Sequence, residues 1–123
     1  MAKRRTLSYP RRGEVHLVRF DPTIGAEIRK TRPALVLQND IGNKEAATTI
    51  VAAITSKFGP EVYPIEVLIE APEGGLETDS VVRLDQIRSV DKARLVKKLG
   101  RLKPATMREV SKAIAISLGM VDE

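Results

Sequence analysis

The stretch EVHLVRFDPTIGAEIRKTRPALVLQ, residues Glu14–Gln38, decides the fold. Its first part, Glu14–Phe20, has the period of two that predicts a β-strand. Asp21-Pro22 ends this strand, and a long loop then runs to Thr31. Pro33–Gln38 is apolar and predicts a second strand. The stretch therefore predicts two strands joined by a long loop.

The middle of the chain continues in the same way. Asn39–Asn43 is rich in turn-forming residues and ends the second strand. Thr48–Ile54 is β-branched and continuous, so we expect a strand that is buried on both faces. After a turn at Gly59-Pro60, the alternating stretch Ile65–Glu70 predicts a fourth strand, and Ser80–Leu84 predicts a fifth.

The last third of the chain predicts one helix. Asp91 is a suitable N-cap for one helical turn, and Leu95–Leu102 returns to extended structure. Pro104 suits the first position of a helix that ends at Gly119. The apolar face of this helix, at spacings of three and four, is Met107, Val110, Ile114 and Leu118. Short strands, tight turns and one closing helix predict a mainly β (α+β) fold, a small barrel capped by the helix.

Length and composition narrow the class of protein. The 123 residues fit one domain, which we place at residues 13–120 behind a basic arm, residues 1–12, that is expected to be disordered. The net charge of +5 attracts polyanions. No cysteine is present, which excludes disulfides and thiol nucleophiles and fits a reducing cytoplasm. No apolar run approaches the roughly 20 residues of a membrane helix, so we expect a cytoplasmic protein without membrane contact.

Most familiar catalytic arrangements are missing from the sequence. The single histidine, His16, lies inside the first strand, where a structural role is expected. With one histidine, no paired carboxylates and no phosphate-binding glycine motif, we expect no metal site and no cofactor.

Polar residues gather at predicted strand ends and in the long loop. The three groups are Glu27, Arg29, Lys30, Thr31 and Arg32 before the second strand; Thr55, Ser56 and Lys57 after the third; and Arg83, Asp85, Gln86 and Arg88 at the fifth. Since strand side chains alternate, Arg83 and Asp85 should share one face, away from Val82 and Leu84. Each group alone also fits a solvated strand end, and the sequence does not show whether the groups converge.

Such residues suit RNA cleavage, because RNA supplies its own nucleophile. Attack by the neighbouring 2′-hydroxyl needs a proton acceptor, a proton donor for the departing 5′ oxygen, and cations that hold the charged phosphorane. Arg, Glu and Thr side chains can meet these needs without a metal.

Four strings carry a specific resemblance to a known family. They are RGEVHLVRFDPTIGAEIRKTRPALVLQNDIGN (Arg12–Asn43), IVAAITSK (Ile50–Lys57), DSVVRLDQIRSVDKARL (Asp79–Leu95) and MREVSKAIAISLG (Met107–Gly119). In this order and spacing they resemble the MazF/PemK toxins over roughly Arg12–Met120. The resemblance implies an SH3-like barrel of five to seven short strands with a C-terminal helix, working as a homodimer.

For function, the resemblance implies a sequence-specific, ribosome-independent and metal-independent endoribonuclease (mRNA interferase). It would cut single-stranded RNA and leave a cyclic phosphate and a 5′-hydroxyl. By matching motif, Arg32 would be the principal catalytic cation, Thr55 would hydrogen-bond the scissile phosphate, and Glu27 would act as base or orient Arg32. We favour charge stabilisation for Arg32, because the guanidinium of arginine stays protonated in proteins. The base stays open between Glu27 and solvent.

The remaining motif positions are candidates for RNA contact. One branch of the family has a histidine where Ala26 stands, so its histidine-dependent chemistry is absent. RNA contact, and not proton transfer, is therefore expected of Arg83, Asp85 and Gln86. The other RNA-binding candidates are Arg29, Lys30, Thr31, Ser56, Lys57 and Arg88. Base specificity is expected from the loops Thr23–Lys30 and Ser56–Tyr63.

The partners implied by the resemblance are single-stranded RNA, a second copy of the chain and a cognate antitoxin. The antitoxin would be a separate small, acidic, MazE-like chain, and its complex with the toxin would bind DNA. Two alternatives stay open, a gyrase-poisoning toxin of the same fold and a non-catalytic RNA-binding SH3-like barrel. The set Arg32, Thr55 and Glu27 argues against the first, and the scarcity of aromatic residues argues against the second.

Overall fold

The computed structural model describes residues 9–22, 24–26 and 30–122. One antiparallel sheet has the strand order β4-β5-β3-β2-β1-β6. Its strands are β1 (Glu14–Arg19), β2 (Thr31–Val36), β3 (Thr48–Thr55), β4 (Glu66–Ile69), β5 (Ser80–Asp91) and β6 (Leu95–Arg101). The helices are α1 (Asp40–Glu45) and α2 (Pro104–Ser117), with short 3-10 turns η1 (Glu73–Gly75) and η2 (Lys92–Arg94).

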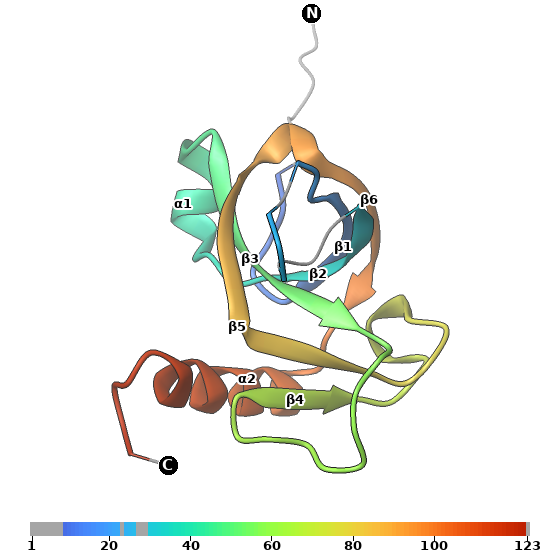
Figure 1. Cartoon of the computed structure of the whole chain (residues 1–123). Helices are drawn as coiled ribbons and strands as arrows, with labels where there is room; N and C mark the ends of the chain where they lie inside the picture. Colours follow the sequence, from blue (N-terminus) through green and yellow to red (C-terminus); the bar gives the residue numbers. More distant parts are fainter. Residues whose placement is uncertain (1–8, 23, 27–29, 123) are drawn as a thin grey trace, which may run out of the picture.

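The sheet curls on itself into a small barrel (Figure 1). The long strand β5 sweeps up one side, β6 lies on the other, and α2 lies beside β4 at the lower end. The predicted strands, the turn after Asp91 and the C-terminal helix that starts at Pro104 are all confirmed. No helix among the described residues is both long and apolar enough to span a membrane.

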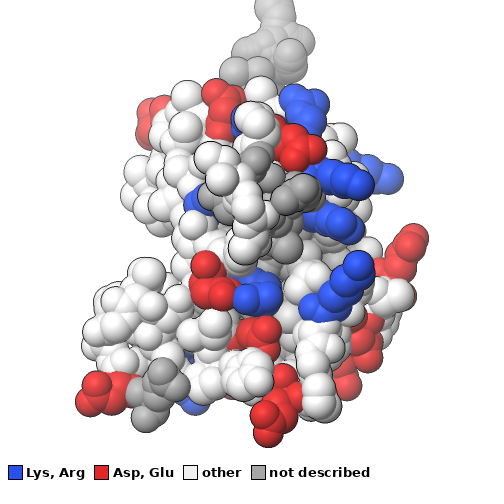
Figure 2. Space-filling model, viewed as in Figure 1, with Lys and Arg blue, Asp and Glu red and all other residues white. Residues whose placement is uncertain are grey.

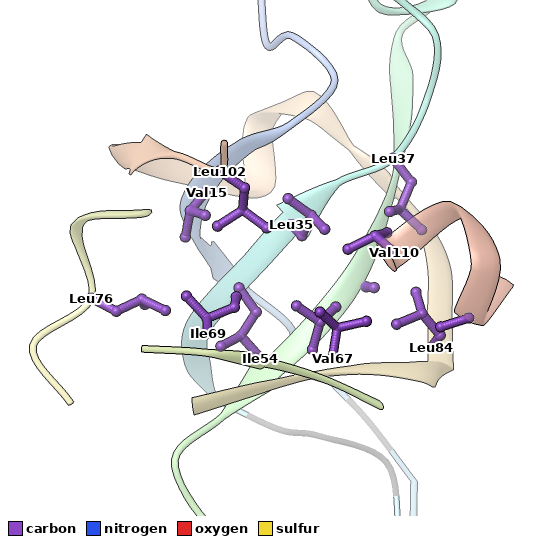
Figure 3. Close-up of a cluster of buried hydrophobic side chains, with 13 residues drawn as sticks. Val15, Leu35, Leu37, Ile54, Val67, Ile69, Leu76, Leu84, Leu102 and Val110 are labelled. Atoms are coloured by element: carbon purple, nitrogen blue, oxygen red, sulfur yellow. The ribbon is translucent and has the colours of Figure 1, made fainter. Parts of the chain in front are cut away.

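The central strands are apolar on both faces because they serve two hydrophobic cores. Along β2, Ala34 and Val36 enter one cluster, and Leu35, with Leu37 just beyond the strand, enters the other. We call the cluster that α2 covers the helix-side core; Figure 3 shows Val110 of α2 pointing into it, towards Leu35 and Leu37. The second cluster, the loop-side core, contains Phe20 and Val51. Full burial of each such side chain contributes about 1.5–3 kcal/mol.

Two predicted elements have different bounds in the structure. The stretch Asn39–Asn43, expected to be a turn, starts helix α1, whose first turn is capped by the Asn39 side chain accepting from the Gly42 N–H at 2.8 Å. The buried Asn43 then accepts the Thr49 hydroxyl hydrogen at 2.6 Å. The fifth strand continues past Leu84 to Asp91, because a register shift against β3 carries the pairing across an irregularity.

The expectation that Thr48–Ile54 is buried on both faces holds for only part of that strand. Val51 to Ile54 are fully buried, but Thr48 is exposed and Ile50 is 36% exposed. At its start the strand is covered on one face only, because Thr49 is fully buried between the exposed Thr48 and Ile50.

A backbone contact closes the barrel near the candidate site. Gly75 has a positive φ of 75°, and a Cβ built on it would lie 2.0 Å from the Leu99 carbonyl oxygen. A Cβ on Gly100 would lie 2.6 Å from the Gly74 carbonyl carbon. Only glycine allows this approach, so η1 lies directly against β6.

Candidate active site

A pocket of about 520 Å³ opens where β2 and β3 meet the loop after η1. Register explains why two of the predicted groups meet there. Ala34 pairs with Ala53, and continuing the antiparallel ladder by two residues brings Arg32 level with Thr55. Ser56 and Lys57 continue the same wall. The apolar part of the lining includes Leu17, Pro33, Ile54, Leu76 and Leu99.

Arg32 and Thr55 are both available to a ligand. The Arg32 side chain is exposed, and within the described residues it has no ion-pair or hydrogen-bond partner. The Thr55 hydroxyl oxygen accepts the Lys57 backbone N–H at 3.1 Å. This bond fixes the oxygen and leaves the hydroxyl hydrogen to be donated to an anion. An unpaired guanidinium beside an oriented hydroxyl can hold a phosphate group.

The other residues of the first predicted group lie near the pocket or outside the described structure. Thr31 pairs with Arg19 at the exposed start of β2. Lys30 is exposed, has a positive φ of 67°, and donates its backbone N–H to the Asp21 carboxylate at 2.9 Å. Glu27 and Arg29 lie outside the described residues.

The third predicted group borders a neighbouring hollow of about 550 Å³. Asp85, Gln86 and Arg88 line it together with Phe20 and Ala26. Its remaining lining residues are Ala53, Ile87 and Ser89. The described members of the three predicted groups therefore do not converge on one pocket. The first pocket is lined by Arg32 of the first group and by Thr55, Ser56 and Lys57 of the second, and the neighbouring hollow is lined by Asp85, Gln86 and Arg88 of the third.

Arg83, a candidate for RNA contact, is paired with carboxylates in the structure. It shares a face with Asp85, away from the fully buried Val82 and Leu84, as the alternation predicts. The Asp85 carboxylate accepts from Arg83 Nε at 3.0 Å and from Nη2 at 2.7 Å, and Glu66 lies 3.5 Å away. The hydrogen bonds that Arg83 donates to Asp85 raise the pKa of Arg83. Two carboxylates thus already neutralise this guanidinium.

Sequence reasoning missed the loop after η1, which supplies Glu77, Thr78 and Ser80 to the first pocket. Glu77 is the one carboxylate among the described residues that line it. Asp79, between them, ties the loop down by accepting the Ala71 backbone N–H at 2.9 Å. The polar run ETDS, residues 77–80, precedes an apolar strand and could have indicated this part of the site. Its place beside the pocket depends on the close backbone contact between Gly75 and Leu99, which the sequence does not reveal.

His16 lies away from the pocket, in a polar cluster on the other side of β1. Its Nε2 lies 2.9 Å from Glu14, which also accepts from the Arg11 backbone N–H at 3.0 Å and pairs with Lys98 at 3.1 Å. Burial alone would raise the pKa of Glu14, but the hydrogen bonds from His16, Arg11 and Lys98 outweigh it and lower the pKa. This arrangement agrees with the structural role expected of His16.

The basic arm is partly integrated into the domain. Residues 1–8 lie outside the described structure, but the Arg12 side chain binds the Leu37 carbonyl and donates to the Ser111 hydroxyl at 3.0 Å. The Arg12 backbone N–H also donates to Asp40 at 2.8 Å. Figure 2 shows Lys and Arg side chains gathered on the side of the molecule where Figure 1 places β6. Among the described residues, no three acidic or histidine side chains form a group that could hold a metal ion.

The fold and the pocket define a class of small antiparallel barrels with a polar pocket at the strand ends. A solved structure of this class, the crystal structure of MazF (Form-I) from Deinococcus radiodurans, matches with a TM-score of 0.79 and 30% identity, covering 92% of this chain and 99% of that one. The crystal structure of MazE–MazF (Form-II) from the same organism matches with a TM-score of 0.74 and 27% identity, covering 93% of this chain and 99% of that one.

Comparison of the amino-acid sequence with known proteins shows which protein family the chain belongs to. A model of the PemK-like, MazF-like toxins of type II toxin–antitoxin systems matches residues 11–118. The endoribonuclease EndoA of Bacillus subtilis is 44% identical over 91% of this chain and 97% of its own length. The endoribonuclease MazF of Staphylococcus saprophyticus is 46% identical over 89% of this chain and 92% of its own length. The chain belongs to the PemK/MazF toxin family, which confirms the resemblance stated above.

Proposed function

We propose that this protein is a sequence-specific, ribosome-independent endoribonuclease toxin that cuts single-stranded mRNA in the cytoplasm without a metal ion. The observation that carries the proposal is that Arg32, which has no partner among the described residues, lines one pocket together with Thr55. Two relatives that are named endoribonucleases, at 44% and 46% identity over most of the chain, support it.

The proposed reaction uses the 2′-hydroxyl of the substrate as the nucleophile. This oxygen attacks the adjacent phosphorus, the bond from phosphorus to the 5′ oxygen of the next nucleotide breaks, and the products are a cyclic phosphate and a 5′-hydroxyl. The proton of the 2′-hydroxyl goes to a base, and the departing oxygen takes up a proton. Arg32 stabilises the negative charge of the phosphorane and stays protonated throughout, and Thr55 donates its hydroxyl hydrogen to the same phosphate.

The base is assigned to the loop carboxylate Glu27 or to solvent. Glu27 lies five residues before Arg32 in a loop whose ends are held together by the Phe20–Lys30 backbone hydrogen bond of 2.8 Å. A carboxylate in that loop can accept the hydroxyl proton or orient the Arg32 guanidinium by charge.

The RNA strand is proposed to run over both hollows. Arg29, Lys30 and Lys57 supply charge for phosphates near the first pocket. In the second hollow, the Gln86 amide and Asp85 carboxylate can hydrogen-bond the edges of an unstacked base, with Arg88 beside them. Thr31, Ser56 and Arg83 complete the proposed RNA contacts, although Arg83 brings little net charge because Asp85 and Glu66 hold it.

We infer that the protein works as a homodimer and is neutralised by a separate, small, acidic MazE-like antitoxin. The Deinococcus relative solved together with MazE supports the partner. A groove that accepts a flexible polyanion also suits a disordered acidic peptide, which would order on binding near Arg32 and exclude RNA.

Purified protein incubated with a long RNA of known sequence in EDTA tests the proposal. Discrete fragments with 5′-hydroxyl ends and cyclic phosphates are expected from wild type and not from Arg32→Ala. Intact RNA with a mobility shift would instead support the non-catalytic RNA-binding barrel. DNA damage that depends on gyrase, with intact RNA, would support the gyrase poison.

A further inference from the structure

Two arginines from outside the long loop bind the backbone at its first residues. Arg94, on η2, donates from Nη1 to the Arg19 carbonyl at 3.0 Å and also to the Asp21 carbonyl. Arg88, on β5, donates to the Phe20 carbonyl at 3.5 Å, and its guanidinium lies 5.6 Å from the centre of the Phe20 ring. Three consecutive carbonyls at the end of β1 are therefore each bound by a guanidinium.

The 3-10 turn η2, which carries Arg94, is held by two hydrogen bonds. The Asp91 carboxylate caps η2 by accepting the Ala93 backbone N–H at 2.8 Å. The Lys92 backbone N–H donates to the Ala47 carbonyl at 3.0 Å, which fastens η2 to the start of β3. The turn that carries Arg94 is therefore held by contacts within the barrel and not by the loop.

The segment that Arg94 binds is paired directly with the strand that carries the proposed catalytic cation. Arg19 pairs with Thr31, and Val18 pairs with Arg32. On the loop side, the Lys30 backbone N–H donates to the Asp21 carboxylate at 2.9 Å. The backbone at Arg32 is therefore one residue pair away from the carbonyls that Arg94 holds.

We propose that Arg94 is a positioning residue that fixes the start of β2, and so the guanidinium of Arg32, relative to the pocket. This inference rests on the proposed function of Arg32. Arg94 does not line the pocket, so it acts through the Arg19–Thr31 backbone pair and not by touching RNA. Its carbonyl partners lie near solvent, and water can replace Arg94 there without unfolding the barrel.

The test compares wild type with Arg94→Ala, Arg94→Lys and the control Arg108→Ala. Arg108 is exposed on α2 and has no partner among the described residues. A catalytic group displaced by about 1 Å loses up to about 100-fold in rate, so we expect Arg94→Ala to lower kcat about 10- to 100-fold. KM should change less than about twofold, since the phosphate-binding cations remain. Arg94→Lys, which can still reach a carbonyl, should recover part of kcat, and Arg108→Ala should match wild type.

Two further readouts separate positioning from a merely structural role. In an Arg32→Ala background, adding Arg94→Ala should lower the residual rate no further, because the group it positions is gone. Backbone amide exchange at Phe20 and Thr31 should accelerate in Arg94→Ala, while the melting temperature stays within a few degrees of wild type.

The positioning role would be overturned if Arg94→Ala kept the wild-type kcat, or if Arg94→Ala and Arg108→Ala lost the same amount of rate. It would also be overturned if the losses from Arg94→Ala and Arg32→Ala were additive. Unchanged amide exchange at Phe20 and Thr31 would overturn it as well. A wild-type protein that does not cut RNA would refute the proposed function separately. The amide exchange of Arg94→Ala would still decide, in that case, whether Arg94 holds the loop.

Discussion

Arg32 and Arg83 flank the same strand, β3, yet their guanidinium groups are in opposite situations. Arg32 is exposed and unpaired within the described residues, and it faces a pocket that contains an oriented hydroxyl. Arg83 is bound by both oxygens of Asp85 and lies near Glu66. A cation in a sequence motif is therefore a strong catalytic candidate only if the fold leaves its charge unmatched.

The largest expected effect belongs to Arg32. Replacing it by alanine removes a cation that stabilises the phosphorane, a loss of about 3 kcal/mol, and should slow cleavage about a hundredfold or more. The exposed side chain packs in no core, so circular dichroism and the melting temperature should match wild type. Cleavage at the wild-type rate by Arg32→Ala would remove Arg32 from the catalytic set.

The second largest effect on the cleavage rate is expected from the substitution of Thr55. A hydrogen bond to a charged group contributes about 1.5–3 kcal/mol, so Thr55→Ala should lower kcat about 10- to 100-fold, and Thr55→Ser should keep most of it. The competing role is structural, because the Thr55 hydroxyl oxygen also accepts the Lys57 N–H. If Thr55→Ala lowers the melting temperature and activity in parallel, and Thr55→Ser restores both in parallel, the hydroxyl only holds the turn.

The salt dependence of RNA affinity should differ between variants of the two arginines. Each phosphate neutralised on a single strand contributes about −0.7 to the slope of log affinity against log salt. Arg32→Ala should reduce the magnitude of the slope by about that amount, while Arg83→Ala should leave it nearly unchanged. Fluorescence anisotropy over a salt series measures both, with an RNA analogue that lacks the attacking 2′-hydroxyl and so cannot be cut. A larger change for Arg83→Ala would mean that RNA displaces its carboxylate partners.

The smallest effect should be the loss of stability in Arg83→Ala. Its ion pairs are partly exposed to solvent, with side-chain exposures of 30% for Arg83 and 37% for Asp85, so their contribution is about 0.5–1 kcal/mol. Urea denaturation should detect this difference and its reduction in high salt. A loss of several kcal/mol would mean that Glu66, which is only 9% exposed, depends on Arg83 for its charge balance.

Sequence patterns predict most of the fold because the spacing of apolar residues along each strand indicates which of its side chains are buried. They fail where structure depends on side-chain capping or on a shift of register. Helix α1 is missed because its Gly42 and Asn43 are poor helix formers, and the Asn39 cap stabilises it. The second half of β5 is missed because Asp85 and Gln86 interrupt the apolar pattern at the register shift.

The candidate site is predictable only in part for the same physical reason. Local sequence places Arg32 and Thr55 at strand ends, and the pairing of β2 with β3 then decides that they are level. The contribution of Glu77 depends on a backbone contact between Gly75 and β6, far away in sequence. Alternation along β5 predicts that Asp85 lies beside Arg83, but the second carboxylate, Glu66, comes from β4, and motif matching does not reveal that pairing.

The most direct test of the account is single-turnover cleavage of one defined RNA in EDTA by wild type, Arg32→Ala and Arg83→Ala, with analysis of the new ends. We expect 5′-hydroxyl and cyclic phosphate ends from wild type and, within a few-fold of its rate, from Arg83→Ala. We also expect a loss of about a hundredfold or more in Arg32→Ala. A protein that loses cleavage with Arg83→Ala and keeps it with Arg32→Ala would contradict the assignment of the catalytic cation.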